Sequence, residues 1–142
     1  MNMKLLGTAV GALALFVAGA ASAATLHFTA MLMGADEVPA NTTMGMGELS
    51  ATLDTDTKVF TYKVTYSGTT GPGIAAHFHG PAAPGATAGP VVMAGNAANP
   101  ISGTVILTDP QIADLKAGKW YFNVHTAAHP GGEIRGQVKL AP

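Results

Sequence analysis

The sequence predicts an all-β fold, an antiparallel β-sandwich or barrel of seven to eight short strands with one short helical turn. Apolar and polar residues alternate with a period of two along most of the chain after residue 24, as in strands with one buried face. Clusters rich in glycine, proline, serine and aspartate separate the alternating runs and mark turns. Short strands divided by such turns are typical of antiparallel sandwiches and barrels.

Each alternating run places its large apolar side chains on one face. The strands are predicted at residues 25–33, 47–53, 58–66, 74–80, 101–108, 120–126 and 133–140, with a further short strand at 91–93. The residues expected in the core include Phe60, Phe78, Trp120, Phe122, Val124 and Ile134. Ile74 is expected on the buried face with Phe78, because four positions separate the two residues.

One helical turn is predicted after the strand at 101–108. Thr108 and Gln111 have the spacing of a capping box, in which the threonine hydroxyl and the glutamine side chain satisfy free backbone N–H groups. Gly118 is expected to end the turn. Ile112 and Leu115 would then attach it to the core.

The first residues have the three-part pattern of a cleavable signal peptide at residues 1–23. Lys4 is followed by an uncharged apolar run at 5–18 and by the small-residue cleavage motif Ala21-Ser22-Ala23. The run is shorter than the roughly 20 residues that a membrane-spanning helix needs. We therefore expect a mature domain at 24–142 that is periplasmic or extracellular, with no membrane span after signal cleavage.

Composition restricts the partners of this domain. The chain has seven Lys and Arg residues, of which Lys4 lies in the predicted signal peptide, against eight Asp and Glu residues. A slightly acidic domain without a basic patch is a poor fit to nucleic acid. The chain has no cysteine, so disulfides cannot stabilise it and packing or a bound ligand must do so.

Histidines form the best candidate site. His77 and His79 are two positions apart on a predicted strand, so both project from the face opposite Phe78. His125 projects from the polar face of a second strand. Three imidazoles suit a copper or zinc ion, with an open position left for water. Glu133 is expected on the same face, as a fourth ligand or as an acceptor for an imidazole N–H.

Further residues have weaker roles in this prediction. Arg135, His129 and Asn123 are expected as supporting groups around the histidines. In the alternative interpretation, His77 and His79 hydrogen-bond the backbone and hold the turn at Gly80-Pro81. Methionine pairs at 31/33 and 44/46 offer thioethers to Cu(I), or fill gaps in a small core. His27 stands alone on its strand.

Four motifs in order carry a resemblance to a known family. They are Gly-Ala-Asp-Glu-Val-Pro at 34–39, Ala-Ala-His-Phe-His-Gly-Pro at 75–81, Tyr-Phe-Asn-Val-His-Thr at 121–126 and Pro-Gly-Gly-Glu-Ile-Arg-Gly-Gln at 130–137. Together they resemble the CHRD domain, named after chordin, the extracellular antagonist of bone morphogenetic proteins. The resemblance implies an extracellular all-β domain of the stand-alone bacterial form. The cysteine-rich modules of chordin are missing, so growth-factor binding is not implied.

Two hypotheses for function follow. In the first, the protein is a secreted or periplasmic CHRD-domain binding module that holds copper or zinc in its histidine cluster without catalysis, and its protein or small-molecule partner is an unknown extracellular or periplasmic ligand. In the second, it is a small periplasmic copper or zinc enzyme with redox activity toward oxygen species. We prefer the module, because the sequence places no acid–base pair and no nucleophile beside the histidines.

Overall fold

The computed structural model describes residues 23–142. The predicted signal peptide, residues 1–23, therefore lies outside the described residues except for Ala23. Among the described residues, no helix has the length and apolar character needed to cross a membrane.

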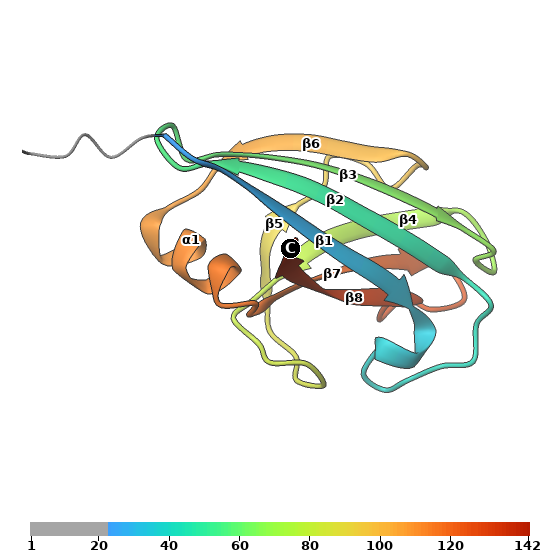
Figure 1. Ribbon diagram of the computed structural model, residues 1–142. Coiled ribbons are helices and arrows are strands. Elements are labelled where there is room, and N and C mark those ends of the chain that lie inside the picture. The colour runs from blue at the N-terminus through green and yellow to red at the C-terminus, as the bar shows by residue number, and fades with distance from the viewer. Residues whose placement is uncertain (1–22) are drawn as a thin grey trace, which may run out of the picture.

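Residues 23–142 form one antiparallel sheet of eight strands, which confirms the predicted all-β class (Figure 1). The strands are β1 (Thr25–Met33), β2 (Met46–Asp54), β3 (Val59–Ser67), β4 (Gly73–His79), β5 (Pro90–Met93), β6 (Ile101–Ile106), β7 (Trp120–Thr126) and β8 (Ile134–Leu140). Their order across the sheet is β5-β4-β7-β8-β1-β2-β3-β6. A short 3-10 helix, η1 (Gly34–Asp36), follows β1, and the α-helix α1 (Asp109–Lys116) precedes β7.

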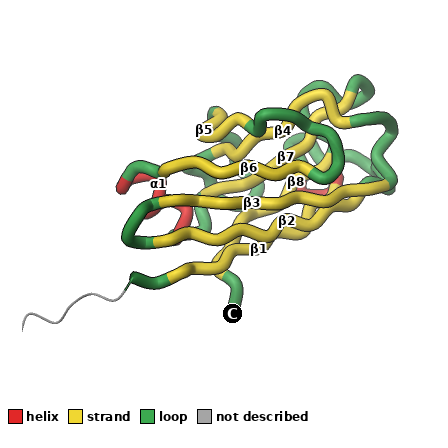
Figure 2. The backbone as a smooth tube through the Cα atoms, turned by 90° about the horizontal axis from the view of Figure 1, so that it is seen from above, coloured by secondary structure: helices red, strands yellow, loops and turns green. Residues whose placement is uncertain are grey.

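The sheet curls into a half-barrel around an aromatic core. Strands β6, β3, β2 and β1 run side by side in one half (Figure 2). Phe60 on β3 meets Phe78 on β4 edge to face, with ring centroids 5.4 Å apart, so the two halves of the sheet are packed against each other. The six core residues named from the sequence are all fully buried, which confirms the buried face predicted at these six positions.

Ile74 departs from the predicted pattern. Its side chain is 59% exposed although the sequence predicts it on the buried face. Gly73 pairs with Thr126 and Ala75 pairs with His125, so β4 carries one residue more than β7 at this point. Such a β-bulge turns the extra side chain out of the alternation.

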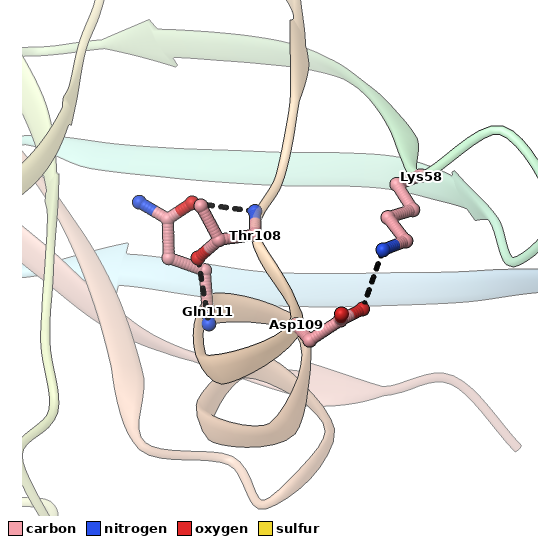
Figure 3. Close-up of polar contacts among 4 residues, drawn as sticks. All are labelled: Lys58, Thr108, Asp109 and Gln111. Atoms are coloured by element: carbon pink, nitrogen blue, oxygen red, sulfur yellow. Dashed lines mark hydrogen bonds and ion pairs between the residues drawn. The ribbon is translucent and has the colours of Figure 1, made fainter.

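The strand predicted at 101–108 ends earlier, at Ile106, because the next residues serve the helix. Thr108 is the N-cap of α1: its hydroxyl accepts the backbone N–H of Gln111, and the Gln111 side chain accepts the backbone N–H of Thr108 (Figure 3). Lys58 adds an ion pair to Asp109 at 2.7 Å, but both side chains are exposed and the pair contributes little. Leu115 is fully buried and attaches the helix to the core.

We expect Thr108→Ala to lower the free energy of unfolding by about 1 kcal/mol, because it removes one half of the capping box. Thr108→Ser keeps the hydroxyl and should retain most of the wild-type stability. Urea denaturation followed by tryptophan fluorescence measures both, since Trp120 lies in the core. Equal losses in the two variants would show that the hydroxyl is not what stabilises this helix.

Candidate metal centre

Strands β4 and β7 bring the three histidines to one place. They pair antiparallel, with Ala75 opposite His125 and His77 opposite Asn123. Phe78 and Phe122 point into the core from the even-numbered positions of both strands. The odd-numbered positions therefore point to the other face, where the imidazoles are half-buried.

The distances among these imidazoles are those of candidate metal ligands. One nitrogen from each of His77, His79 and His125 can be chosen so that all three lie within 4.8 Å of one another. His77 Nδ1 and His125 Nε2 are 3.1 Å apart. Two nitrogens bound to one tetrahedral ion at 2.0–2.1 Å would be roughly 3.3 Å apart. The first pair is thus already spaced for a shared ion.

Backbone carbonyls fix the orientation of two of the rings. Nδ1 of His125 lies 2.9 Å from the carbonyl oxygen of Pro130, to which it donates as an N–H group. In the neutral ring this leaves the lone pair on Nε2, the atom directed at His77. Nδ1 of His79 lies 2.9 Å from the carbonyl oxygen of Ala88 in the same way. An outer N–H bound to a carbonyl is the usual support of a metal-binding histidine.

His79 places both of its ring nitrogens close to oxygen atoms. Its Nε2 faces Oδ1 of Asn123 at 3.1 Å, while its Nδ1 faces the Ala88 carbonyl. The Asn123 side chain also hydrogen-bonds the Glu37 carboxyl group. Since a neutral imidazole has a single N–H, one of its two nitrogens meets an oxygen without a proton between them. A cation at Nε2 would remove this conflict.

The surroundings of His77 and His79 favour the neutral form of both rings. Burial lowers the pKa of His77, and the charges that His125 and His79 would carry lower it further. Burial also lowers the pKa of His79 and outweighs its hydrogen bonds to Ala88 and Asn123, while the charges of His125 and Arg135 act in the same direction as burial. Neutral imidazole is the form that binds a metal ion. Burial therefore favours the neutral form of His77 and His79, which is the form that a metal ion would need.

Arg135 and Tyr121 support the cluster from one side. The Arg135 guanidinium lies 3.4 Å above the Tyr121 ring and donates to the carbonyl of Ala86 at 2.6 Å. His79 stacks in parallel on Tyr121 with a centroid distance of 4.8 Å. Tyr121 thus lies between a fixed cation and an imidazole. The sequence indicates Arg135 as a supporting group but does not indicate Tyr121.

Glu37 is a buried residue whose carboxyl group hydrogen-bonds Asn123. The sequence prediction of the site does not include it. Burial raises its pKa to about 7, against the opposing effects of the Arg135 charge, the Val38 backbone N–H and the Asn123 side chain. Within the described part of the chain, its Oε1 has no hydrogen-bond partner. The signal for this residue is its place in the first CHRD-like motif, at 34–39. Through Asn123, Glu37 is linked to His79.

Glu133 is not brought to the histidines. It lies in a bend before β8, and its fully buried carboxylate turns toward loops on the other side of β7. There it accepts hydrogen bonds of 2.5–2.8 Å from the hydroxyls of Thr43, Thr70 and Thr126 and from the backbone N–H of Thr70. Glu133 therefore joins these loops and is neither a metal ligand nor an acceptor for an imidazole N–H. We call the three threonines Thr43, Thr70 and Thr126 around this carboxylate the threonine ring.

The remaining predicted residues lie apart from the cluster. His129 is in the turn between β7 and β8, and its imidazole is not part of the histidine group. His27 is exposed on β1, opposite Thr52. The exposed methionines Met31 and Met46 lie on β1 and β2, so strands β7 and β8 separate them from β4.

Comparison with known proteins gives one result. The family model of the CHRD domain matches residues 28–138, nearly the whole of the described chain. No curated protein and no solved structure matches the chain. The matched segment contains the three histidines together with Asn123 and Glu37.

Proposed function

Because this chain belongs to the CHRD domain family, we propose that it is an exported CHRD-domain module that binds a copper or zinc ion through His77, His79 and His125. The proposed role is binding, without assigned catalysis. One observation carries the proposal. Nδ1 of His77 and Nε2 of His125 face each other at 3.1 Å, with the outer nitrogen of His125 held by a backbone carbonyl.

Two neutral rings at this distance satisfy each other with one N–H, but the third ring makes a metal site the better explanation. His79 brings a third nitrogen close to these two, and its Nε2 faces the Asn123 side-chain oxygen. A borderline cation such as Zn²⁺ or Cu²⁺ matches three imidazole nitrogens, and water or another group would complete the coordination. Asn123 and Arg135 would position the ligands.

Export is proposed on the sequence of the first residues. A charged start, an apolar run and a small-residue motif precede the domain at the positions expected of a signal peptide. N-terminal sequencing of protein recovered outside the cytoplasm should find a chain that begins near Ala24.

Metal binding predicts a gain in stability. A metal that binds only the folded protein raises the unfolding free energy by about 2.7 kcal/mol at a free concentration one hundred times the dissociation constant. We expect Zn²⁺ or Cu²⁺ to raise the melting temperature of residues 24–142 at pH 7.5. His77→Ala and His125→Ala should abolish that gain, while His27→Ala, which changes an exposed histidine on β1, should keep it. Differential scanning calorimetry with and without metal gives the answer.

The same gain should depend on pH in a defined direction. The pKa values of His77 and His79 are lowered, so protons compete with the metal only when the pH falls below the ordinary histidine value of about 6.5. The gain should be present at neutral pH and should decrease as the pH falls below about 6.5. Retention of the full gain in His77→Ala, or a gain that does not change with pH, would exclude this cluster as the metal site.

A further inference from the structure

We propose that Met93 is the fourth ligand of this centre and that its thioether makes the site select Cu(I) over Zn²⁺. The inference rests on the proposed function, because it adds a ligand to the same three histidines. Met93 lies on the edge strand β5, whereas the three histidines lie on β4 and β7.

The sheet register places Met93 beside the cluster. Strand β5 pairs antiparallel with β4, and Met93 is directly opposite His77. The backbone N–H of Ala94 donates to the carbonyl of Ala76 at 3.0 Å and holds this register. Residues directly opposite on paired strands point to the same face, with Cβ atoms about 4.5–5.5 Å apart. Met93 therefore leaves the sheet on the face of the imidazoles.

Core packing does not account for the side chain of Met93. It is 63% exposed, whereas its neighbour Val92 is buried on the opposite face against the aromatic core. Three rotatable side-chain bonds give methionine the freedom to direct its sulfur at a neighbouring group. The residue directly opposite Met93 is His77, which provides one of the three candidate ligand nitrogens.

The chemistry of the resulting ligand set favours Cu(I). Thioether sulfur is a soft ligand that selects Cu(I), while carboxylate and other hard oxygen ligands favour harder ions. The threonine ring holds the one carboxylate expected at the site, Glu133, away from the histidines. Three neutral imidazoles and a neutral thioether add no negative charge, and Arg135 lies near His79. A monovalent ion is less repelled there than a divalent one.

The test is an anaerobic titration of residues 24–142 with Cu(I) against the chromophoric chelator bicinchoninate, beside a Zn²⁺ competition titration. Met93→Leu should weaken Cu(I) binding on the order of 10–100-fold, the range seen for losses around a metal site, and leave Zn²⁺ affinity unchanged. The matched control is Met31→Leu, another half-exposed strand methionine, which should bind both ions like the wild type. X-ray absorption of the Cu(I) protein should show a sulfur neighbour that Met93→Leu lacks.

The outcomes separate this inference from the proposed function. If wild type and Met93→Leu bind Cu(I) equally and neither shows a sulfur neighbour, the inference fails while the histidine site stands. If the wild type binds neither ion, or His125→Ala binds both as tightly, the proposed function fails and the inference falls with it. Unchanged melting temperatures of the metal-free variants will show that the fold is intact.

Discussion

Glu133→Ala should lower the free energy of unfolding by about 3–5 kcal/mol, because each buried donor left without its acceptor costs about 1–3 kcal/mol and such losses do not simply add. The variant leaves four donors in the threonine ring without a partner: the hydroxyls of Thr43, Thr70 and Thr126 and the backbone N–H of Thr70. It also disconnects the loop after η1, the loop between β3 and β4, and the β7–β8 turn.

Urea denaturation measures this loss, and two further variants define its cause. Glu133→Gln keeps the shape but replaces one acceptor oxygen with a donor, so it should also be strongly destabilised. Glu48→Gln removes an exposed carboxylate from β2 and should change stability little. A Glu133→Gln protein as stable as the wild type would show that the negative charge is not what holds the loops.

Glu133 also predicts the acid limit of the fold. Burial alone would raise the pKa of Glu133, but hydrogen bonds from Thr126, Thr43 and Thr70 outweigh it and hold the pKa at about 2. A carboxylate whose pKa is depressed by folding stabilises the protein above its unfolded pKa, which is about 4.3. This contribution should fade as the pH falls from about 4.3 toward 2, and Glu133→Ala should lack that part of the pH profile.

Phe78→Ala should have the second large effect, a loss of about 3–5 kcal/mol, as for other buried phenylalanines replaced by alanine. The Phe78 ring is fully buried and contacts the rings of Phe60, Tyr62, Trp120 and Phe122, with centroid distances of 4.7–5.8 Å. It lies between the two halves of the curled sheet, so the cavity left by the variant cannot close without moving both halves.

The matched control for Phe78 is Ile74→Ala on the same strand. The sequence pattern assigns both residues to the buried face, whereas the bulge turns Ile74 out to solvent. Ile74→Ala should therefore change the unfolding free energy by no more than about 0.5 kcal/mol, the usual range for surface positions. Similar losses in the two variants, measured by denaturant titration, would contradict the bulge.

Alternation along the chain was enough to predict the strands that carry the site. Trp120–Thr126 is found as predicted, and the even–odd split that buries Phe122 also places His125 on the opposite face. The pairing of β4 with β7 is not encoded in either strand alone. This pairing depends on how the whole chain folds. The sequence alone therefore could not predict that the three imidazoles would lie close together.

The wrong predictions for Ile74 and Glu133 have the same physical cause, because both residues lie where the backbone departs from regular strand geometry. A single inserted residue reverses the face of every side chain on one side of it, and the pattern at 74–80 gives no sign of the bulge at Ile74. Glu133 lies one residue before β8, where period-two alternation no longer decides direction. Partners at positions 43 and 70 come from distant loops, and local spacing does not identify them.

The position of β8 between β7 and β1 has a consequence for how this domain is made. Strand β8 pairs with β1, Leu140 beside Phe28, and with β7, so the centre of the sheet is complete only after residues 134–140 have been made. Folds dominated by contacts between distant segments form slowly, since the long loops must close before their contacts stabilise them. A nascent chain that lacks residues 134–140 leaves β1 and β7 without their shared neighbour. Late folding of this kind suits a protein that is threaded through a membrane as an extended polypeptide, as the proposed export requires.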